Sequence, residues 1–161
     1  MKAIGIVNIA WSGINILGAL VGLVIIWVEK MIFFRSPLMN NLNFGFDFTS
    51  YMNTIFDIML IFTPLTLIVF SFLLIGGIKI LKLNNDGIRY TKIAAISIIM
   101  WYIVYMVYSF YSLVPVFQNV PNFNAILSII IAISIIMGLI FVCGYPIFLL
   151  IYLRNRTTIV K

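Results

Sequence analysis

Small and polar residues recur at helical spacing in the first long apolar run of the chain. They follow one another at intervals of three or four: Gly5, Asn8, Ser12, Asn15, Gly18 and Gly22. Residues so spaced lie on one face of a helix. Small residues let membrane helices approach closely, and side-chain amides can form hydrogen bonds between helices. We interpret this face as a packing surface, against the rest of the protein or against a second copy. The alternative is a polar path for a solute, lined by Asn8 and Asn15.

Asp57 is the acidic residue that an apolar run would carry closest to membrane depth. Ionisable groups inside a membrane mark proton or cation handling. However, Thr54-Ile55-Phe56-Asp57 has the Ser/Thr-x-x-acid spacing of an N-terminal helix cap, and the helix dipole favours aspartate in a first turn. We therefore predict that Asp57 caps the second apolar helix near the outer membrane interface. A functional carboxylate is the alternative.

The residue inventory offers little for catalysis or metal binding. The chain has no histidine, so imidazole ligands and Ser-His or Cys-His pairs are excluded within it. Its four acidic residues are dispersed, and its single cysteine, Cys143, lies inside an apolar run. We predict no catalytic residues, no metal site and no cofactor, and therefore a protein that is not an enzyme.

Composition places the chain in a membrane. Of its 161 residues, 64% are hydrophobic and 9% are charged, whereas a soluble domain carries roughly 25% charged residues. Four long apolar runs each reach across a hydrocarbon core of about 30 Å as a helix. The sequence predicts an all-α, polytopic membrane protein: a single domain, 1–161, built as a bundle of four transmembrane helices.

Turn and loop signals divide this domain. We expect the membrane helices at about 3–28, 55–81, 93–115 and 125–153. Between them lie an outer loop at 29–54, an inner hairpin at 82–92 and a second outer loop at 116–124, and an inner tail follows at 154–161. Asn84-Asn85-Asp86-Gly87 is a strong turn signal within the hairpin. The first outer loop is rich in phenylalanine, and we interpret it as an interfacial loop; a lid or docking segment is the alternative.

Basic residues predict the orientation of the helices. With four crossings, eight of the ten basic residues fall on one side: Lys2, Lys79, Lys82, Arg89, Lys92, Arg154, Arg156 and Lys161. The positive-inside rule then places both termini in the cytoplasm, in a bacterial inner or plasma membrane. The hairpin residues Lys79, Lys82, Arg89 and Lys92 are expected to hold this topology and to contact anionic lipid headgroups. Because the basic residues are scattered at the ends of apolar runs, no nucleic-acid partner is expected.

The third helix carries an aromatic stripe. Its members are spaced by four, three and four residues: Trp101, Tyr105, Tyr108 and Ser112. Residues of this kind near a helix end belong to the interfacial aromatic belt. Trp101 and Tyr105 lie deeper, so we expect their polar atoms to find partners inside the bundle. An aromatic-lined ligand pocket is the alternative.

The chain resembles small bacterial four-helix membrane proteins of unknown function. The resemblance rests on the glycine-containing helix end Gly76-Gly77, followed by a Lys-Leu turn with basic residues between the middle helices. It implies the four-helix layout but no functional residues. We therefore hypothesise a non-enzymatic integral membrane protein that acts by helix packing, either as a homo-oligomer or with a membrane-protein partner. The alternatives are a small channel or transporter subunit and a toxin-immunity or membrane-stress protein.

Overall fold

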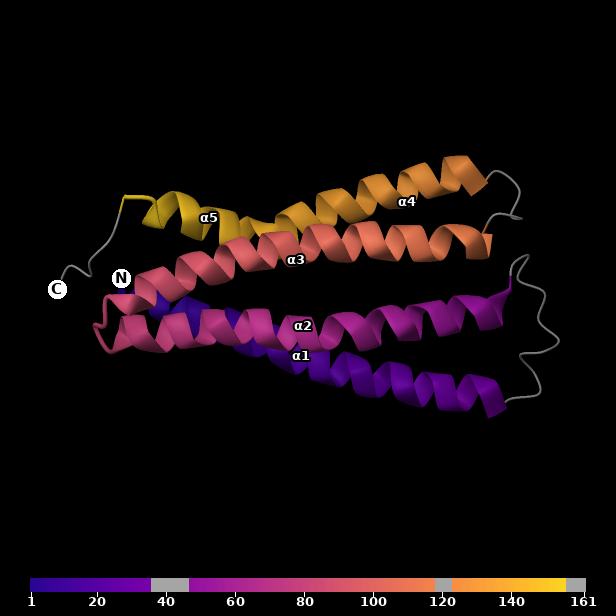
Figure 1. Ribbon diagram of the computed structural model, residues 1–161, viewed down its shortest axis with the longest axis horizontal. Helices are drawn as coiled ribbons and strands as arrows, with labels where there is room; N and C mark the ends of the chain where they lie inside the picture. Colours follow the sequence, from indigo (N-terminus) through magenta and orange to yellow (C-terminus); the bar gives the residue numbers. More distant parts are fainter. Residues whose placement is uncertain (36–46, 118–122, 156–161) are drawn as a thin grey trace.

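The computed structural model describes residues 1–35, 47–117 and 123–155, and these form a bundle of long helices (Figure 1). Helix α1 spans Lys2–Arg35, α2 spans Phe48–Leu81 and α3 spans Asp86–Phe117. The fourth crossing consists of α4 (Phe123–Gly138), a π-helical turn η2 (Leu139–Cys143) and α5 (Gly144–Leu153). No strand occurs in the described ranges. Residues 36–46 of the predicted first outer loop, most of the second loop, and Arg156 and Lys161 of the tail lie outside the described residues.

The prediction of four helices long and apolar enough to cross a membrane is confirmed. The spans are Lys2–Ile32, Phe48–Leu81, Asp86–Phe117 and Ala132–Leu153. At about 1.5 Å per residue, α1 and α2 are each about 50 Å long, so they extend beyond a hydrocarbon core of about 30 Å. The beginning of α1 and the end of α5 lie at the same end of the bundle as the turn between α2 and α3 (Figure 1). We call this the turn end and the opposite end the loop end.

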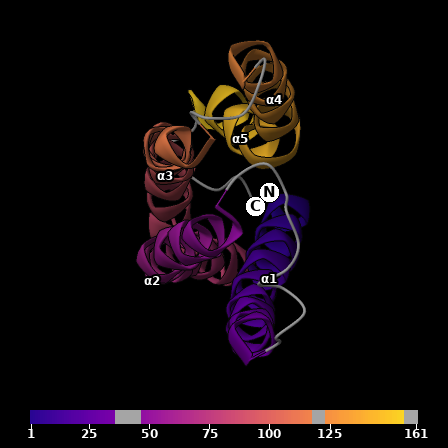
Figure 2. The same ribbon diagram turned by 90° about the vertical axis from the view of Figure 1, so that its right-hand side faces the viewer.

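The helices form an open arc in chain order. The main contacts join α1 to α2, α2 to α3 and α3 to α5. Viewed along the bundle, α1 and α4 stand at opposite ends of the arc (Figure 2). The buried core sits toward the turn end, where Phe70 and Leu73 of α2 meet Ile98 of α3 and Leu149 and Leu153 of α5. The bundle is therefore packed more tightly at its turn end than at its loop end.

The turn between α2 and α3 is tighter than the predicted hairpin at 82–92. Only residues 82–85 lie outside a helix, because Asp86 already opens α3. The α2 end has the two bonds of a Schellman motif: the Asn84 N–H donates to the Lys79 carbonyl at 2.9 Å, and the Leu83 N–H to the Ile80 carbonyl at 3.0 Å. Leu83 takes the left-handed conformation that this motif requires, with φ of 56°.

A π-helical turn interrupts the fourth crossing beside Tyr102 of α3. The Tyr102 hydroxyl donates a hydrogen bond of 2.8 Å to the Ser134 carbonyl of α4. Gly138 lies directly under this hydroxyl, so that even a methyl group there would overlap the tyrosine. Pro146 follows η2 in the first turn of α5, and it cannot donate a backbone hydrogen bond to the preceding turn. The fourth crossing is thus held to α3 at the point where its helical register changes.

We predict that Gly138→Ala destabilises the protein by about 1–3 kcal/mol, the usual cost of overpacking a tight contact. Thermal unfolding of the purified chain in mild detergent measures the change. Gly13→Ala is the matched control, because a Cβ at Gly13 has no atom within 4 Å. That variant should be neutral or slightly more stable, since alanine favours helix over glycine. Equal stability of the two variants would contradict the contact.

Candidate functional site

Asn8 of α1 joins three helices at the turn end. Its Nδ2 donates to the Thr91 Oγ1 of α3 at 3.0 Å, and its Oδ1 accepts from the Tyr145 hydroxyl of α5 at 2.5 Å. The Asn8 side chain is 0% exposed. Both ends of the amide are therefore used inside the bundle. The hypothesis that this face of α1 packs into the bundle is supported at Gly5, Asn8 and Ser12, which are all buried.

Two adjacent glycines of α2 make these contacts possible. A Cβ on Gly77 would lie 2.8 Å from the Gly5 carbonyl oxygen and 2.9 Å from the Asn8 Cβ. A Cβ on Gly76 would lie 2.6 Å from the Thr91 Oγ1. Gly77 therefore lets α1 approach α2, and Gly76 lets α3 approach from the other side. From the sequence this pair is predicted only as a helix end; adjacent glycines in an apolar run were the available signal of a close contact.

The polar side chains farther along α1 bond within their own helix. The Ser12 hydroxyl donates to the Asn8 carbonyl at 2.6 Å, and the Asn15 Nδ2 donates to the Trp11 carbonyl at 2.8 Å. These bonds satisfy the side chains without joining helices. The Asn8 junction is thus the point at which the polar face of α1 reaches α3 and α5.

Gly18 and Gly22, the second half of the same face, have a different environment. A Cβ on Gly18 would have no atom within 4 Å, and one on Gly22 would lie 3.4 Å from the Met59 Cε of α2. Gly18 instead borders a pocket of about 390 Å³ whose walls come from α1, α2 and α3. The lining residues are Ile14, Asn15, Gly18, Ala19, Met59, Phe62, Thr63, Thr66, Trp101 and Tyr105.

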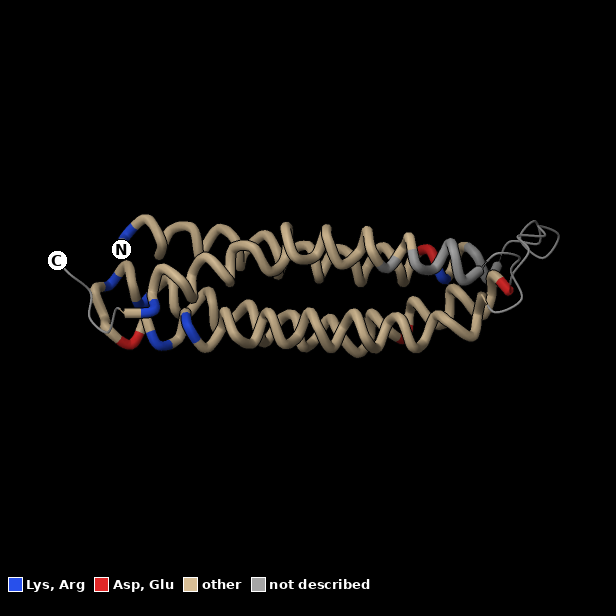
Figure 3. Tube along the Cα trace, turned by 90° about the horizontal axis from the view of Figure 1, so that it is seen from above, with Lys and Arg blue, Asp and Glu red and all other residues tan. Residues whose placement is uncertain are grey.

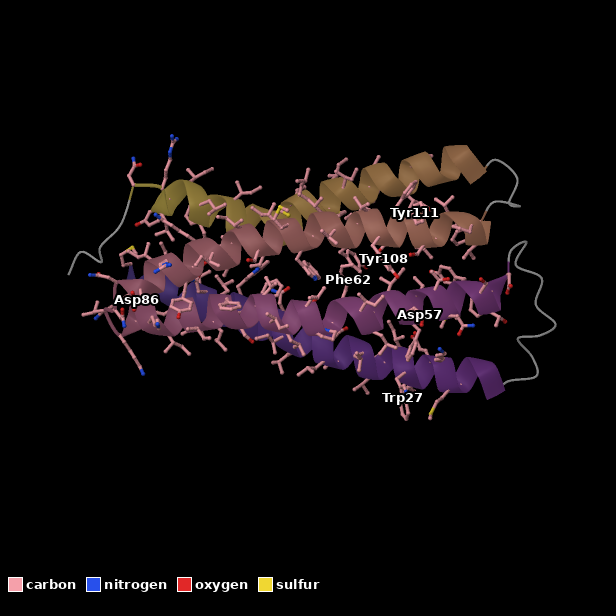
Figure 4. The ribbon with its side chains drawn as sticks, viewed as in Figure 1. Trp27, Asp57, Phe62, Asp86, Tyr108 and Tyr111 are labelled. Carbon is pink, nitrogen blue, oxygen red and sulfur yellow. The ribbon has the colours of Figure 1, made fainter. Side chains whose placement is uncertain are left out.

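Aromatic rings form one wall of the pocket. Phe62 of α2 lies edge-on to Tyr105 with ring centroids 5.2 Å apart, and Trp101 stacks on Tyr105 at 5.7 Å. Tyr108, with its ring 5.5 Å from Phe62, continues the stripe toward the loop end, and Figure 4 shows both side chains in the space between α2 and α3. The predicted stripe thus contributes two of its members to a pocket.

The indole nitrogen of Trp101 lacks the partner that we expected for it. The Trp101 Nε1 is buried and has no hydrogen-bond acceptor among the described residues. The Trp11 Nε1 and the Ser109 Oγ are also buried without a hydrogen-bond partner among the described residues, but neither residue lines the pocket. A buried indole N–H normally has an acceptor.

The prediction that Asp57 caps α2 is wrong. The cap is Asp47, whose side chain accepts a 3.0 Å hydrogen bond from the Ser50 backbone N–H. Helix α2 begins at Phe48, so Asp57 lies in its interior, in the half nearer the loop end (Figure 4). Asp57 is exposed on the bundle surface. It neither lines the pocket nor belongs to the Asn8 junction.

The basic residues of the predicted hairpin gather at the turn end (Figure 3). Lys79 lies 3.9 Å from the Asp86 carboxylate and 4.0 Å from the Tyr90 ring centroid. The Lys92 Nζ lies 3.5 Å from the Arg154 carbonyl oxygen. Lys82 and Arg89 are exposed. This set therefore combines local contacts with two side chains directed toward the surroundings of the bundle end.

The described part of the chain contains no cluster of side chains suited to catalysis. No three His, Cys, Asp or Glu side chains gather there in a way that could hold a metal ion. Cys143 is a buried free thiol in η2. Among the described residues, the Asn8 junction and the pocket each bring together polar side chains from three helices.

We predict that Asn8→Leu destabilises the bundle by about 1–3 kcal/mol. The change removes two interhelical hydrogen bonds, each worth about 0.6–1.7 kcal/mol in a membrane, and leaves the Thr91 and Tyr145 hydroxyls without this partner. Unfolding in mixed micelles with increasing denaturing detergent measures the effect. Asn15→Leu is the control, because its amide bonds only to its own helix. A loss as large for Asn15→Leu would contradict the special role of Asn8.

Asp47→Ala should loosen the beginning of α2 by about 1 kcal/mol, the usual value of an N-terminal cap. Amide hydrogen exchange over residues 47–54 reports this directly, since the capped Ser50 N–H lies there. Asp57→Ala removes the same carboxylate from the helix interior and should leave this exchange unchanged. Faster exchange in Asp57→Ala alone would restore the original prediction.

Comparison with known proteins adds no relative to these observations. No protein-family model, curated protein or solved structure matches the chain. The resemblance to small bacterial four-helix membrane proteins therefore stays a prediction.

Proposed function

We propose that this chain is a non-enzymatic, multi-pass membrane protein that acts by packing the outer half of α1 against another transmembrane segment. The segment belongs to a second copy or to a membrane-protein partner. The observation that carries the proposal is the open space at Gly18, where a Cβ would have no atom within 4 Å. Gly18 is exposed where it borders the open pocket between α1, α2 and α3, so a partner segment packed on it would cover that pocket.

The burial of α1 supports the same proposal. Only 6% of its most apolar stretch is buried, against 28% for α2 and 22% for the other two spans. Lipid tails are as apolar as leucine, so helices in a membrane associate through close packing and polar contacts instead of a hydrophobic force. A surface with glycine and an amide, as at Asn15 and Gly18, has the features that such association uses.

A solute path is less well supported. Such a path would pass Asn8 and Asn15, with Asp57 along it. Asn8 is 0% exposed and both ends of its amide are bonded to neighbouring helices, which closes the bundle at that level. Asp57 is exposed and does not line the pocket between α1, α2 and α3. These positions favour packing over conduction.

We also propose the location and orientation that the charges indicate. The basic residues at the turn end favour a cytoplasmic position for that end, with both termini inside, in a bacterial inner or plasma membrane. The loop end, with Asp47 and the outer loops, then faces outward. At the turn end, the basic residues then have the anionic headgroups of the bilayer as a partner.

The test is association of the full chain after Gly18→Leu. A side chain at position 18 blocks close approach of a partner helix, and its Cβ meets no atom of the chain within 4 Å. We expect at least a several-fold loss of crosslinked or copurified complex in mild detergent and in native membranes. Gly13→Leu is the matched control: it makes the same change on the same helix, also with no atom within 4 Å, but at a different angle around the axis.

Three results bear on the proposal in opposite ways. Loss of the complex in Gly18→Leu, with retention in Gly13→Leu, supports it. Retention in both variants overturns it, as does a wild-type chain that is found alone in every preparation. Thermal unfolding of the two variants shows whether any loss comes from misfolding.

A further inference from the structure

We infer that the partner of α1 is a transmembrane helix of a different membrane protein, and that this helix carries a lysine or arginine at the outer membrane interface. The inference rests on the proposed packing function and names the partner that this function leaves open. Three observations lead to it: Glu29 is exposed, it lies on the same face of α1 as Gly18, and it forms no ion pair with a described side chain.

Glu29 lies on the face of α1 that contains Gly18. It follows Gly18 by eleven residues, which is close to three turns at about 3.6 residues per turn. Ile14, Val21 and Ile25 lie on the same side at helical spacing, and they are 67%, 55% and 50% exposed. We call these five residues the open strip of α1. A helix packed along the open strip covers the space at Gly18 and meets Glu29 at the outer end.

The residue after Glu29 gives the orientation of this part of α1. The Lys30 Nζ lies 3.9 Å from the ring centroid of Phe56 in α2, so position 30 faces the bundle. Successive residues of a helix are turned by about 100°, and Glu29 is exposed beside Lys30. The nearest basic residue along the helix is therefore directed into the chain, and the Glu29 carboxylate faces its surroundings.

The depth of Glu29 determines which partner suits it. Residues 3–28 carry no charge, so Glu29 stands where α1 leaves its apolar stretch. Attraction between opposite charges is stronger at the edge of a membrane than in bulk water, because the effective dielectric constant is lower there. A carboxylate at this level therefore favours a helix with a cation at the same level. Along the apolar part of the open strip, close packing alone is sufficient.

The same geometry disfavours a second copy as the partner. In a symmetric pair, the same surface of each chain meets its counterpart. Two copies inserted in the same direction and packed along the open strip would bring their Glu29 carboxylates to the same level, where like charges repel each other. Lys30 does not relieve this repulsion, since it lies over Phe56 of its own chain. A different chain with a basic residue at this level replaces the repulsion with attraction.

The Glu29→Lys variant of the full chain serves as the probe, because it combines glycine at position 18 with a cation at the level of Glu29. Two copies with different tags are co-expressed, so that both insert in the same direction, and purification through one tag in mild detergent measures the other copy. The wild-type chain should recover about five-fold more Glu29→Lys copies than wild-type copies, the upper value for one exposed ion pair. This gain should disappear in 1 M salt, where the Debye length is only about 3 Å.

The double variant Glu29→Gln/Trp27→Lys is the matched control. It has the same net charge as Glu29→Lys, but its lysine is on nearly the opposite side of the helix. Trp27 is 51% exposed and points away from the bundle (Figure 4). The wild-type chain should recover this copy no better than a copy with Glu29→Gln alone.

Three results would overturn the inference. Equal recovery of wild-type and Glu29→Lys copies would show no role for charge, and equal recovery of Glu29→Lys and the double variant would show no role for the open strip. A stable complex of two wild-type copies in native membranes would identify a second copy as the partner. The packing proposal survives each of these results where Gly18→Leu still reduces the complex formed in native membranes. Retention of that complex in Gly18→Leu overturns the packing proposal itself.

Discussion

The fold depends on one buried amide. A hydroxyl that is buried away from water needs a protein partner. Thr91 is fully buried at the turn end, and the Tyr145 hydroxyl meets it at the same junction. The Asn8 Oδ1 accepts from the Tyr145 hydroxyl at 2.5 Å, and the Asn8 Nδ2 donates to the Thr91 Oγ1 at 3.0 Å. Asn8 thereby holds α1 against both α3 and α5, although the main helix contacts otherwise follow chain order. At Gly76 and Gly77 the absence of a side chain leaves room for α3 and α1 beside α2.

The helices are joined around Asn8 at the turn end, but they are spread apart at the loop end. Helix α1 is held near α5 at Asn8, but at the other end α1 and α4 stand at opposite ends of the arc (Figure 2). The polar face of α1 therefore meets two environments. Gly5 lies against α2 with hardly any space, whereas Gly18 borders a pocket. The small residues of this one face thus lie in two different surroundings, and the difference comes from the position of the other helices.

The sequence was sufficient for the helices and insufficient for their ends. Apolar runs indicate where a chain crosses the hydrocarbon, and four spans of that kind are present. They do not indicate where a helix begins, since α2 starts at Phe48, well before the purely apolar residues. Asp57 was therefore mistaken for a cap, and Asp47 has that role. The same reasoning placed Asp86–Lys92 in a hairpin, although these residues are the first turns of α3. Polar residues at a membrane interface continue a helix as readily as they end it.

Partners across helices were beyond the sequence, because they depend on rotation and tilt. The stripe on the third helix was visible as a pattern, but only the packing of α2 against α3 shows that Trp101 and Tyr105 share a wall with Phe62. The same packing leaves the Trp101 N–H without an acceptor among the described residues. In water such a donor would be hydrated at little cost, but in an apolar environment an unpaired donor costs free energy. The position of Trp101 is therefore set by ring packing against Phe70 and Tyr105 and not by a hydrogen bond. A pattern of residue types along one helix does not reveal packing of this kind, because the rings that set it come from two helices.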